Sequence, residues 1–115
     1  MCKNTTMAFS GDNAYIEDQK ILGYLLAVDH PDGGAKAKFF LGHGYTRDHW
    51  TRLRDDLLII AREGVVCSEV DSPHGHKTVV DGTITAPDNS TIALRTVWMN
   101  NQFEDVQRLI TAYPN

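Results

Sequence analysis

The sequence predicts an α+β protein in which two to three N-terminal helices pack on a C-terminal antiparallel meander of about four strands. Apolar side chains recur at helical spacing before Gly64, whereas β-branched residues and turn signals follow it. No linker rich in Pro or Ser divides the chain. We therefore assign residues 14–115 to a single domain and residues 1–13, rich in Asn, Thr and Ser, to a flexible N-terminal tail.

Composition and charge limit the classes of function. Of the 115 residues, 42% are hydrophobic and 23% are charged, which is typical of a globular domain. The net charge of −4 argues against a basic surface for long duplex DNA but permits an enzyme that contacts a few phosphates. No segment reaches the roughly 20 apolar residues of a membrane span, and residues 1–10 do not resemble a secretory signal. With Cys2 and Cys67 expected as free thiols, the sequence predicts a cytoplasmic protein with no membrane contact.

The first helix is predicted to begin near Asp18, after a short edge strand at residues 14–16. Its expected buried stripe consists of Ile21, Leu25 and Val28. Gly23 weakens this helix, because glycine inside a helix costs about 1 kcal/mol relative to alanine. The helix should end in the loop at residues 30–34, where a histidine precedes a proline and two glycines follow.

Two further helices are expected before the strands begin. The shorter one covers residues 35–41 and ends at Gly42. The longer one takes Thr46 as its N-terminal cap and Gly64 as its C-terminal glycine. Its expected buried stripe consists of Trp50, Leu53, Leu57 and Ala61.

The second half of the chain has the pattern of a sheet. Four strands are expected at residues 65–70, 78–86, 91–99 and 109–113. Turn signals at residues 73–75 and 87–90 separate the first three, and Gly82 is expected to kink or bulge the second strand. Short connections between successive strands favour antiparallel neighbours, so the strands should form a meander.

Five segments carry a family resemblance. They are K-I-L-G-Y-L-L at 20–26, H-P-D-G-G-A-K-A-K-F-F at 30–40, G-Y-T-R-D-H-W at 44–50, R-T-V-W at 95–98 and L-I-T-A-Y-P at 109–114. In this order, across residues 14–114, they resemble a family of small, uncharacterised bacterial and phage-associated domains. That family is similar to the barnase–EndoU–colicin–RelE-like ribonucleases of toxin systems. The resemblance implies helices packed behind a sheet, and metal-independent RNA cleavage on the sheet face through a 2′,3′-cyclic phosphate.

The implied chemistry needs a proton acceptor, a proton donor and cationic groups near the phosphorus. The candidate catalytic residues are His30, Arg95, Thr111 and Tyr113. The candidate substrate-binding residues are Lys36, Lys38 and Thr96. No sequence motif indicates a cofactor or a metal site, so neither is expected.

The glycine-rich loop and the helix after it supply three of these candidates. His30 is a candidate acid or base because an unperturbed imidazole has a pKa of about 6.5. The alternative is a loop histidine that hydrogen-bonds the local backbone. Lys36 and Lys38 are separated by roughly 200° around a helix, so only one is expected to reach the site. Lys38 is preferred if the loop leads into the pocket.

Strand alternation relates the other candidates. If the tryptophan that follows on the same strand is buried, Thr96 points inward with it and Arg95 lies on the open face. There Arg95 can hold a phosphate or pair with a cross-strand carboxylate such as Asp81. Thr111 and Tyr113 share a face of the last strand, where a hydroxyl and a phenol can bind phosphate or stack on a base.

A second hypothesis is a non-enzymatic binding or accessory module. The order of helices and strands also fits a cystatin-like or NTF2-like fold, which often forms homodimers through its sheet. The apolar surface for such a dimer would contain Ile84, Ile92 and Leu94. The expected partner is therefore RNA under the first hypothesis, and a protein partner or a second copy of the chain under this one.

Overall fold

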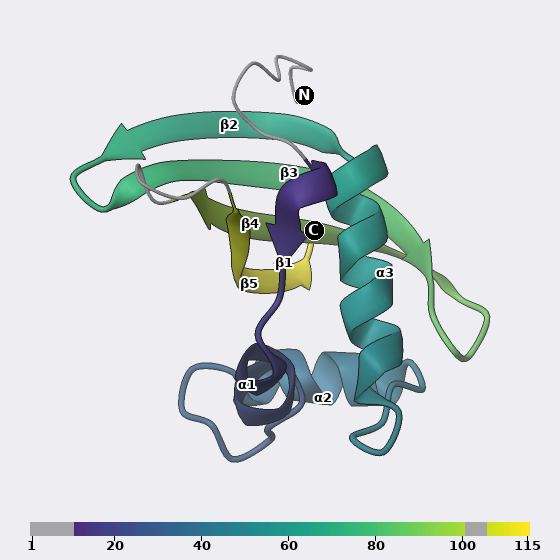
Figure 1. Ribbon diagram of the computed structural model, residues 1–115. Coiled ribbons are helices and arrows are strands. Elements are labelled where there is room, and N and C mark those ends of the chain that lie inside the picture. Colours follow the sequence, from purple (N-terminus) through teal and green to yellow (C-terminus); the bar gives the residue numbers. More distant parts are fainter. Residues whose placement is uncertain (1–10, 101–105) are drawn as a thin grey trace.

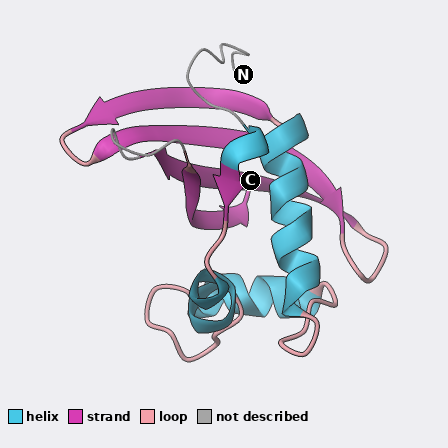
Figure 2. Cartoon of the chain, viewed as in Figure 1, coloured by secondary structure: helices cyan, strands magenta, loops and turns pink. Residues whose placement is uncertain are grey.

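The computed structural model describes residues 11–100 and 106–115, in which three α-helices pack against one curved five-stranded sheet (Figure 1 and Figure 2). In chain order the elements are η1 (Gly11–Asn13), β1 (Ala14–Tyr15), α1 (Asp18–Lys20), η2 (Ile21–Leu25), α2 (Gly34–Gly42), α3 (Trp50–Glu63), β2 (Val65–Ser72), β3 (Gly75–Thr85), β4 (Thr91–Asn100) and β5 (Gln107–Pro114). The strand order across the sheet is β1-β5-β4-β3-β2. The predicted α+β class, with helices before the meander, is confirmed.

The N-terminal part of the domain begins earlier than predicted. Gly11–Asn13 form a short 3-10 helix that packs on α3, although these residues were expected in the tail. A side chain at Gly11 would collide with the carbonyl oxygen of Ala61, so only glycine permits this close approach. The rest of the predicted tail, residues 1–10, lies outside the described residues.

The first helix differs from its prediction in shape. It begins at Asp18. Glu17 is at the N-cap position, but its side chain makes no capping hydrogen bond. After one turn the helix continues as the π-helical segment η2. The wider turn is closed by the amide of Leu26, which donates to the carbonyl oxygen of Ile21 over 2.8 Å. Val28 is 45% exposed, so the buried stripe ends at Leu25. Gly23 lies within η2, where its weak preference for the α conformation makes such a departure easier.

Helices α2 and α3 lie close to their predicted ranges. Helix α3 begins at Trp50, later than expected, because the hydroxyl of Thr46 accepts the amide of His49 at 3.2 Å and closes a turn ahead of the helix. Its end at Gly64 agrees with the prediction. Figure 1 shows α1 and α2 together at the end of α3 remote from β2.

The sheet contains the predicted meander and one further strand. Strands β2 to β5 pair antiparallel, and the edge strand β1 pairs parallel to β5, with Ala14 opposite Gln107. Register shifts occur between Val66 and Ser68 and between Val97 and Trp98. Of the kink or bulge expected at Gly82, the bulge is absent, since this residue pairs in register with Leu94. Its missing side chain instead allows α3 to approach, because a Cβ there would lie 3.0 Å from Cγ2 of Ile60.

The core lies between the helices and one face of the sheet. Trp98 and Thr96 on β4 have 0% exposure, in agreement with their predicted inward orientation. The three residues expected to form an apolar dimer surface are also in this core, at 6%, 6% and 0% exposure for Ile84, Ile92 and Leu94. The chain's own helices therefore take up the apolar sheet face, and these three residues are not available to a second copy.

Two observations concern the protein's surroundings. Cys67 is disulfide-bonded, so the expected free thiol at this position is wrong. Disulfides are typical of oxidising compartments, and Cys67 therefore gives no support to a cytoplasmic location. Among the described helices, none is long and apolar enough to cross a membrane.

Candidate functional site

A pocket of about 330 Å³ opens beside the first helix and the glycine-rich loop. It is lined by Glu17, Gln19, Lys20, Gly23, Tyr24 and His30. The wide turn of η2 and the loop before α2 thus place a phenol, an imidazole and an ammonium group around one opening. Segments of π-helix are frequent at functional sites, which agrees with this position.

Tyr24 connects the pocket to the last strand. Its hydroxyl oxygen lies 3.1 Å from Oγ1 of Thr111 on β5. Thr111 is opposite Val97 in the register, next to the bulge of the β4–β5 pair. The candidate on β5 therefore reaches the pocket through a tyrosine that the sequence analysis did not select.

Two lysines surround the ring of Tyr24. The Nζ atoms of Lys20 and Lys36 lie 5.1 Å and 5.4 Å from the ring centroid. Burial alone would raise the pKa of the Tyr24 phenol, but hydrogen bonds from Thr111 and Lys36, with the charges of Lys36 and Lys20, lower that pKa below its ordinary value. These contacts therefore stabilise the ionised phenol of Tyr24 relative to an isolated tyrosine.

His30 is held by the backbone of its own loop. Its Nδ1 accepts the amide hydrogens of Asp32 and Gly33, each over 2.9 Å. Because an amide can only donate, Nδ1 carries no proton and the ring proton is on Nε2. The His30 ring meets the Tyr24 ring in an edge-to-face contact, with centroids 5.0 Å apart. His30 thus presents an N–H donor to its surroundings.

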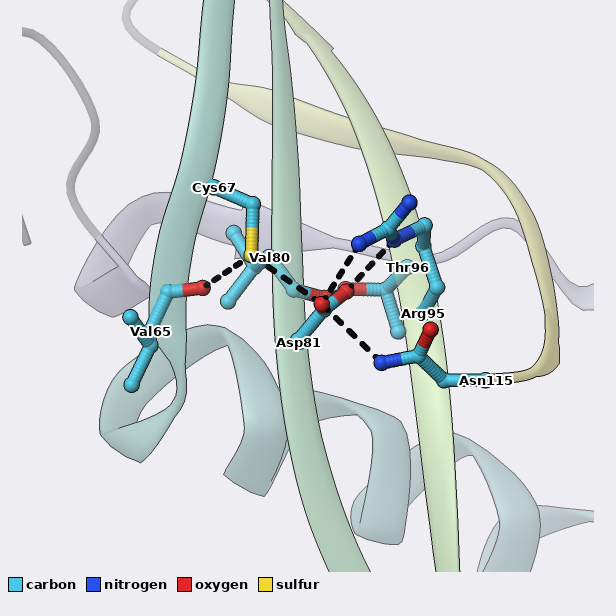
Figure 3. Close-up of polar contacts among 7 residues, drawn as sticks. All are labelled: Val65, Cys67, Val80, Asp81, Arg95, Thr96 and Asn115. Carbon is cyan, nitrogen blue, oxygen red and sulfur yellow. Dashed lines mark hydrogen bonds and ion pairs between the residues drawn. The ribbon is translucent and has the colours of Figure 1, made fainter. Parts of the chain in front are cut away.

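Arg95 lies on the open face of β4, as the strand alternation predicts, and it is paired with Asp81 (Figure 3). Its Nε and Nη2 donate to the two carboxylate oxygens of Asp81, each over 2.8 Å. The Nδ2 of Asn115 donates to Oδ2 of the same carboxylate over 3.0 Å, and the sulfur of Cys67 lies 3.0 Å from that oxygen. The guanidinium of Arg95 lowers the pKa of Asp81 below its ordinary range. The pairing that the sequence analysis left as an alternative is therefore present.

The remaining β-strand candidates divide between the two faces of the sheet. Tyr113 is directly opposite Arg95 in the register, and it is two residues from Thr111 on the same strand. Arg95, Tyr113 and Thr111 therefore lie next to one another on the open face. Thr96 is on the covered face, where its hydroxyl donates to the carbonyl oxygen of Val80 and accepts the indole N–H of Trp98, both over 2.7 Å. Thr96 belongs to the core and not to the site.

Neither candidate lysine lines the pocket itself, and only one of the two lies close to it, as their separation around the helix requires. It is Lys36, beside Tyr24, whereas Lys38 is exposed on another side of α2. The preference for Lys38 is not supported by this geometry. Sequence reasoning also missed Lys20 and Tyr24, although their four-residue spacing places two side chains on one helical face.

Comparison with solved structures shows what the fold is similar to. The chain is similar to a chain from a contact-dependent growth inhibition toxin–immunity protein complex from Klebsiella pneumoniae 342, with a TM-score of 0.72 and 11% sequence identity. The match covers 91% of this chain and 96% of that chain. A search of curated proteins finds no match. Residues 10–115 match a family model, and the chain belongs to the family described as Domain of unknown function (DUF6883).

Proposed function

We propose that the pocket at Tyr24 binds RNA and cleaves it without a metal ion, through a 2′,3′-cyclic phosphate. One observation carries the proposal: Tyr24, His30 and Lys20 line one pocket of about 330 Å³, and the Nζ of Lys36 lies 5.4 Å from the centroid of the Tyr24 ring. In-line attack of a ribose 2′-hydroxyl on its own phosphate needs groups of these types, to accept a proton and to stabilise charge on the phosphate oxygens.

Each group has a role in this proposal. Lys20 and Lys36 offset the negative charge of the phosphate, and the Nε2–H of His30 donates to one of its oxygens. When the Tyr24 phenol is ionised, the hydroxyl of Thr111 is the donor of the hydrogen bond between them.

The cross-strand pair of Arg95 and Tyr113, which lies next to Thr111 on the open sheet face, is proposed to hold the next nucleotide. Asp81 occupies the Nε–Nη2 edge of Arg95, so a second phosphate would bind at the remaining end of the guanidinium, beside the hydroxyl of Tyr113 that also interacts with Arg95. Tyr113, opposite Arg95, offers a ring on which an unpaired base can stack. The pocket at Tyr24 and the pair of Arg95 and Tyr113 would thus bind successive nucleotides of single-stranded RNA.

The charges around the pocket set a limit on affinity. Glu17 also lines the pocket, and its Oε1 is paired with Nη1 of Arg108 at 3.4 Å, which offsets the repulsion of a phosphate. With a net charge of −4 for the whole chain, binding should depend on few phosphate contacts and weaken with added salt.

The structural likeness supports a toxin-related module that acts with a protein partner, because the similar chain comes from a complex of a toxin and its immunity protein. The proposed place of action is the cytoplasm, where RNA is found. A second candidate function follows from the same likeness, which does not distinguish between the two members of such a complex. In that case the chain is a non-enzymatic binding module that pairs with a toxin.

Cleavage assays distinguish the two candidates. Purified protein is incubated with a tRNA and with an mRNA, once in EDTA and once in magnesium. The proposal expects equal cleavage in both buffers, a strong loss of cleavage in His30→Ala, and little change in the melting temperature of that variant. Wild-type protein that leaves both RNAs intact in both buffers contradicts the proposal and favours the binding module.

A further inference from the structure

We propose that Tyr24, and not His30, accepts the proton of the ribose 2′-hydroxyl; this inference rests on the RNA cleavage proposed above. The contacts of the pocket converge on this phenol. Its oxygen contacts Thr111, its ring contacts the ring of His30, and both ammonium groups lie near its ring.

The geometry of His30 opposes a role as base. A neutral imidazole accepts a proton only at its unprotonated nitrogen, which here is Nδ1. That nitrogen already accepts two backbone amide hydrogens, from Asp32 and Gly33. Protonation at Nδ1 would break both bonds and open the loop that places the ring. His30 therefore acts through its Nε2–H, as a donor to a phosphate oxygen.

The surroundings of Tyr24 favour its anion. A tyrosine phenol ordinarily has a pKa of about 10, so an isolated one is a poor acceptor near neutral pH. Here the hydroxyl of Thr111 and the ammonium groups of Lys36 and Lys20 oppose the effect of burial and lower the pKa of Tyr24. Within the described chain, the carboxylate that lines the same pocket, Glu17, is engaged by Arg108, which makes it a weaker competitor for the role.

The Tyr24 phenolate takes the proton of the 2′-hydroxyl, and the 2′-oxygen forms a bond to phosphorus. The bond from phosphorus to the 5′-oxygen breaks, and its electron pair stays on that oxygen, which takes a proton from water in the open pocket. Tyr24 then releases its proton to water. The products are a 2′,3′-cyclic phosphate and a 5′-hydroxyl, and no oxidant or metal is consumed.

Tyr24→Phe tests the role, because it keeps the ring and removes only the hydroxyl. Tyr15→Phe is the matched control, since Tyr15 is 47% exposed on β1 and outside the pocket. The expected result is a loss of kcat of about 10²-fold or more for Tyr24→Phe. The affinity for a non-cleavable 2′-O-methyl RNA should stay close to wild type in both variants, and Tyr15→Phe should retain its kcat.

The pH dependence separates an acceptor from a structural residue. Wild-type kcat should rise with pH through the pKa of Tyr24, and Tyr24→Phe should lack this rise. His30→Asn should keep it, because an asparagine oxygen can accept the same two amides while the Nε2–H is lost; its KM should increase instead. An ultraviolet titration of the phenols gives a readout that does not depend on activity, and Tyr24→Phe should remove the first phenol to ionise.

The outcomes are distinguishable. Wild-type protein that cleaves no RNA overturns the proposed function and this inference with it. Active wild-type protein combined with a Tyr24→Phe variant of similar kcat and unchanged pH profile overturns the inference alone. Loss of the pH-dependent rise in His30→Asn, with its retention in Tyr24→Phe, assigns the acceptor to His30 and likewise overturns it.

Discussion

The hydroxyl oxygen of Tyr24 lies 3.1 Å from Oγ1 of Thr111, and 87 positions separate the two residues in the chain. The contact joins η2, near the start of the domain, to β5 at its end. It therefore forms only when the last strand has paired with the sheet. The proposed site therefore needs the folded domain, because residues from distant segments form it. The first prediction tests this contact.

Thr111→Val should reduce cleavage by roughly 10- to 100-fold at neutral pH, since a hydrogen bond to a charged group contributes roughly 1.5–3 kcal/mol. The reason is that Thr111 helps to lower the pKa of Tyr24, and without its hydroxyl this pKa rises. The loss should shrink at higher pH, and Thr111→Ser should retain most of the activity. Rates measured across pH check this. An equal loss at every pH would mean that Thr111 acts in some other way.

Lys36→Ala and Lys38→Ala form a matched pair on one helix. Only Lys36 lies near Tyr24, so only its removal should weaken RNA binding and reduce the salt dependence of binding, by roughly 0.7 in the logarithmic slope for one contact to single-stranded RNA. Titrations with a fluorescent RNA at several salt concentrations measure both quantities. Equal effects of the two substitutions would show that the phosphate does not bind at Tyr24.

Asp81→Asn should destabilise the domain by about 1 kcal/mol at neutral pH, because it removes one charge of the pair with Arg95. Arg95 lowers the pKa of Asp81 in the folded state. The stabilisation is therefore present above the unfolded pKa of about 3.9 and is lost as the pH falls through the lower folded pKa. Urea unfolding at neutral and acidic pH should show the difference between wild type and variant becoming smaller in acid. A difference independent of pH would contradict this.

His76 gives a pH dependence of the opposite sign. Its Nδ1 lies 2.6 Å from Asp71 and its Nε2 lies 3.1 Å from Glu69; these contacts raise the pKa of His76. Its contribution to stability is fully present below the unfolded pKa of about 6.5 and is lost as the pH rises through the higher folded pKa. His76→Gln should lower the melting temperature more in mild acid than in mild base.

The exposed neighbour in the same turn provides the control for this prediction. His74→Gln should change the melting temperature little at either pH, since the imidazole of His74 makes no ion pair within residues 11–100 and 106–115. If His76→Gln lowers the melting temperature equally at both pH values, the two carboxylates do not hold the imidazolium.

Much of the fold could be predicted because local patterns decide it. Gly64 separates a helical period from a strand period, and the turn residues separate the strands, so the order of the elements follows from the sequence. The π-turn of η2 has no such pattern, since it is defined by backbone hydrogen bonds such as the one from the amide of Leu26 to the carbonyl oxygen of Ile21. The bulge expected at Gly82 was wrong because that glycine serves the packing of α3 and not the bending of its strand.

The site was predictable only in part, for a similar reason. Strand alternation placed Arg95 on the open face, and register places Tyr113 opposite it. Tyr24 could not be selected from its own segment, because its significance depends on Thr111 and on a loop histidine that other segments bring to it. Thr96 was a plausible hydroxyl in sequence, but its hydrogen bond to the buried indole shows a structural role.

The most direct test of the account is the chemical nature of the cut ends. Wild-type protein is incubated in EDTA with a single-stranded RNA of defined sequence, and the products are identified by mass spectrometry, with a substrate carrying a 2′-deoxy sugar at the cleaved position as control. The account predicts 2′,3′-cyclic phosphate and 5′-hydroxyl ends, and an intact control. Absence of cleavage, cleavage of the 2′-deoxy substrate, or products with 3′-hydroxyl ends would contradict it.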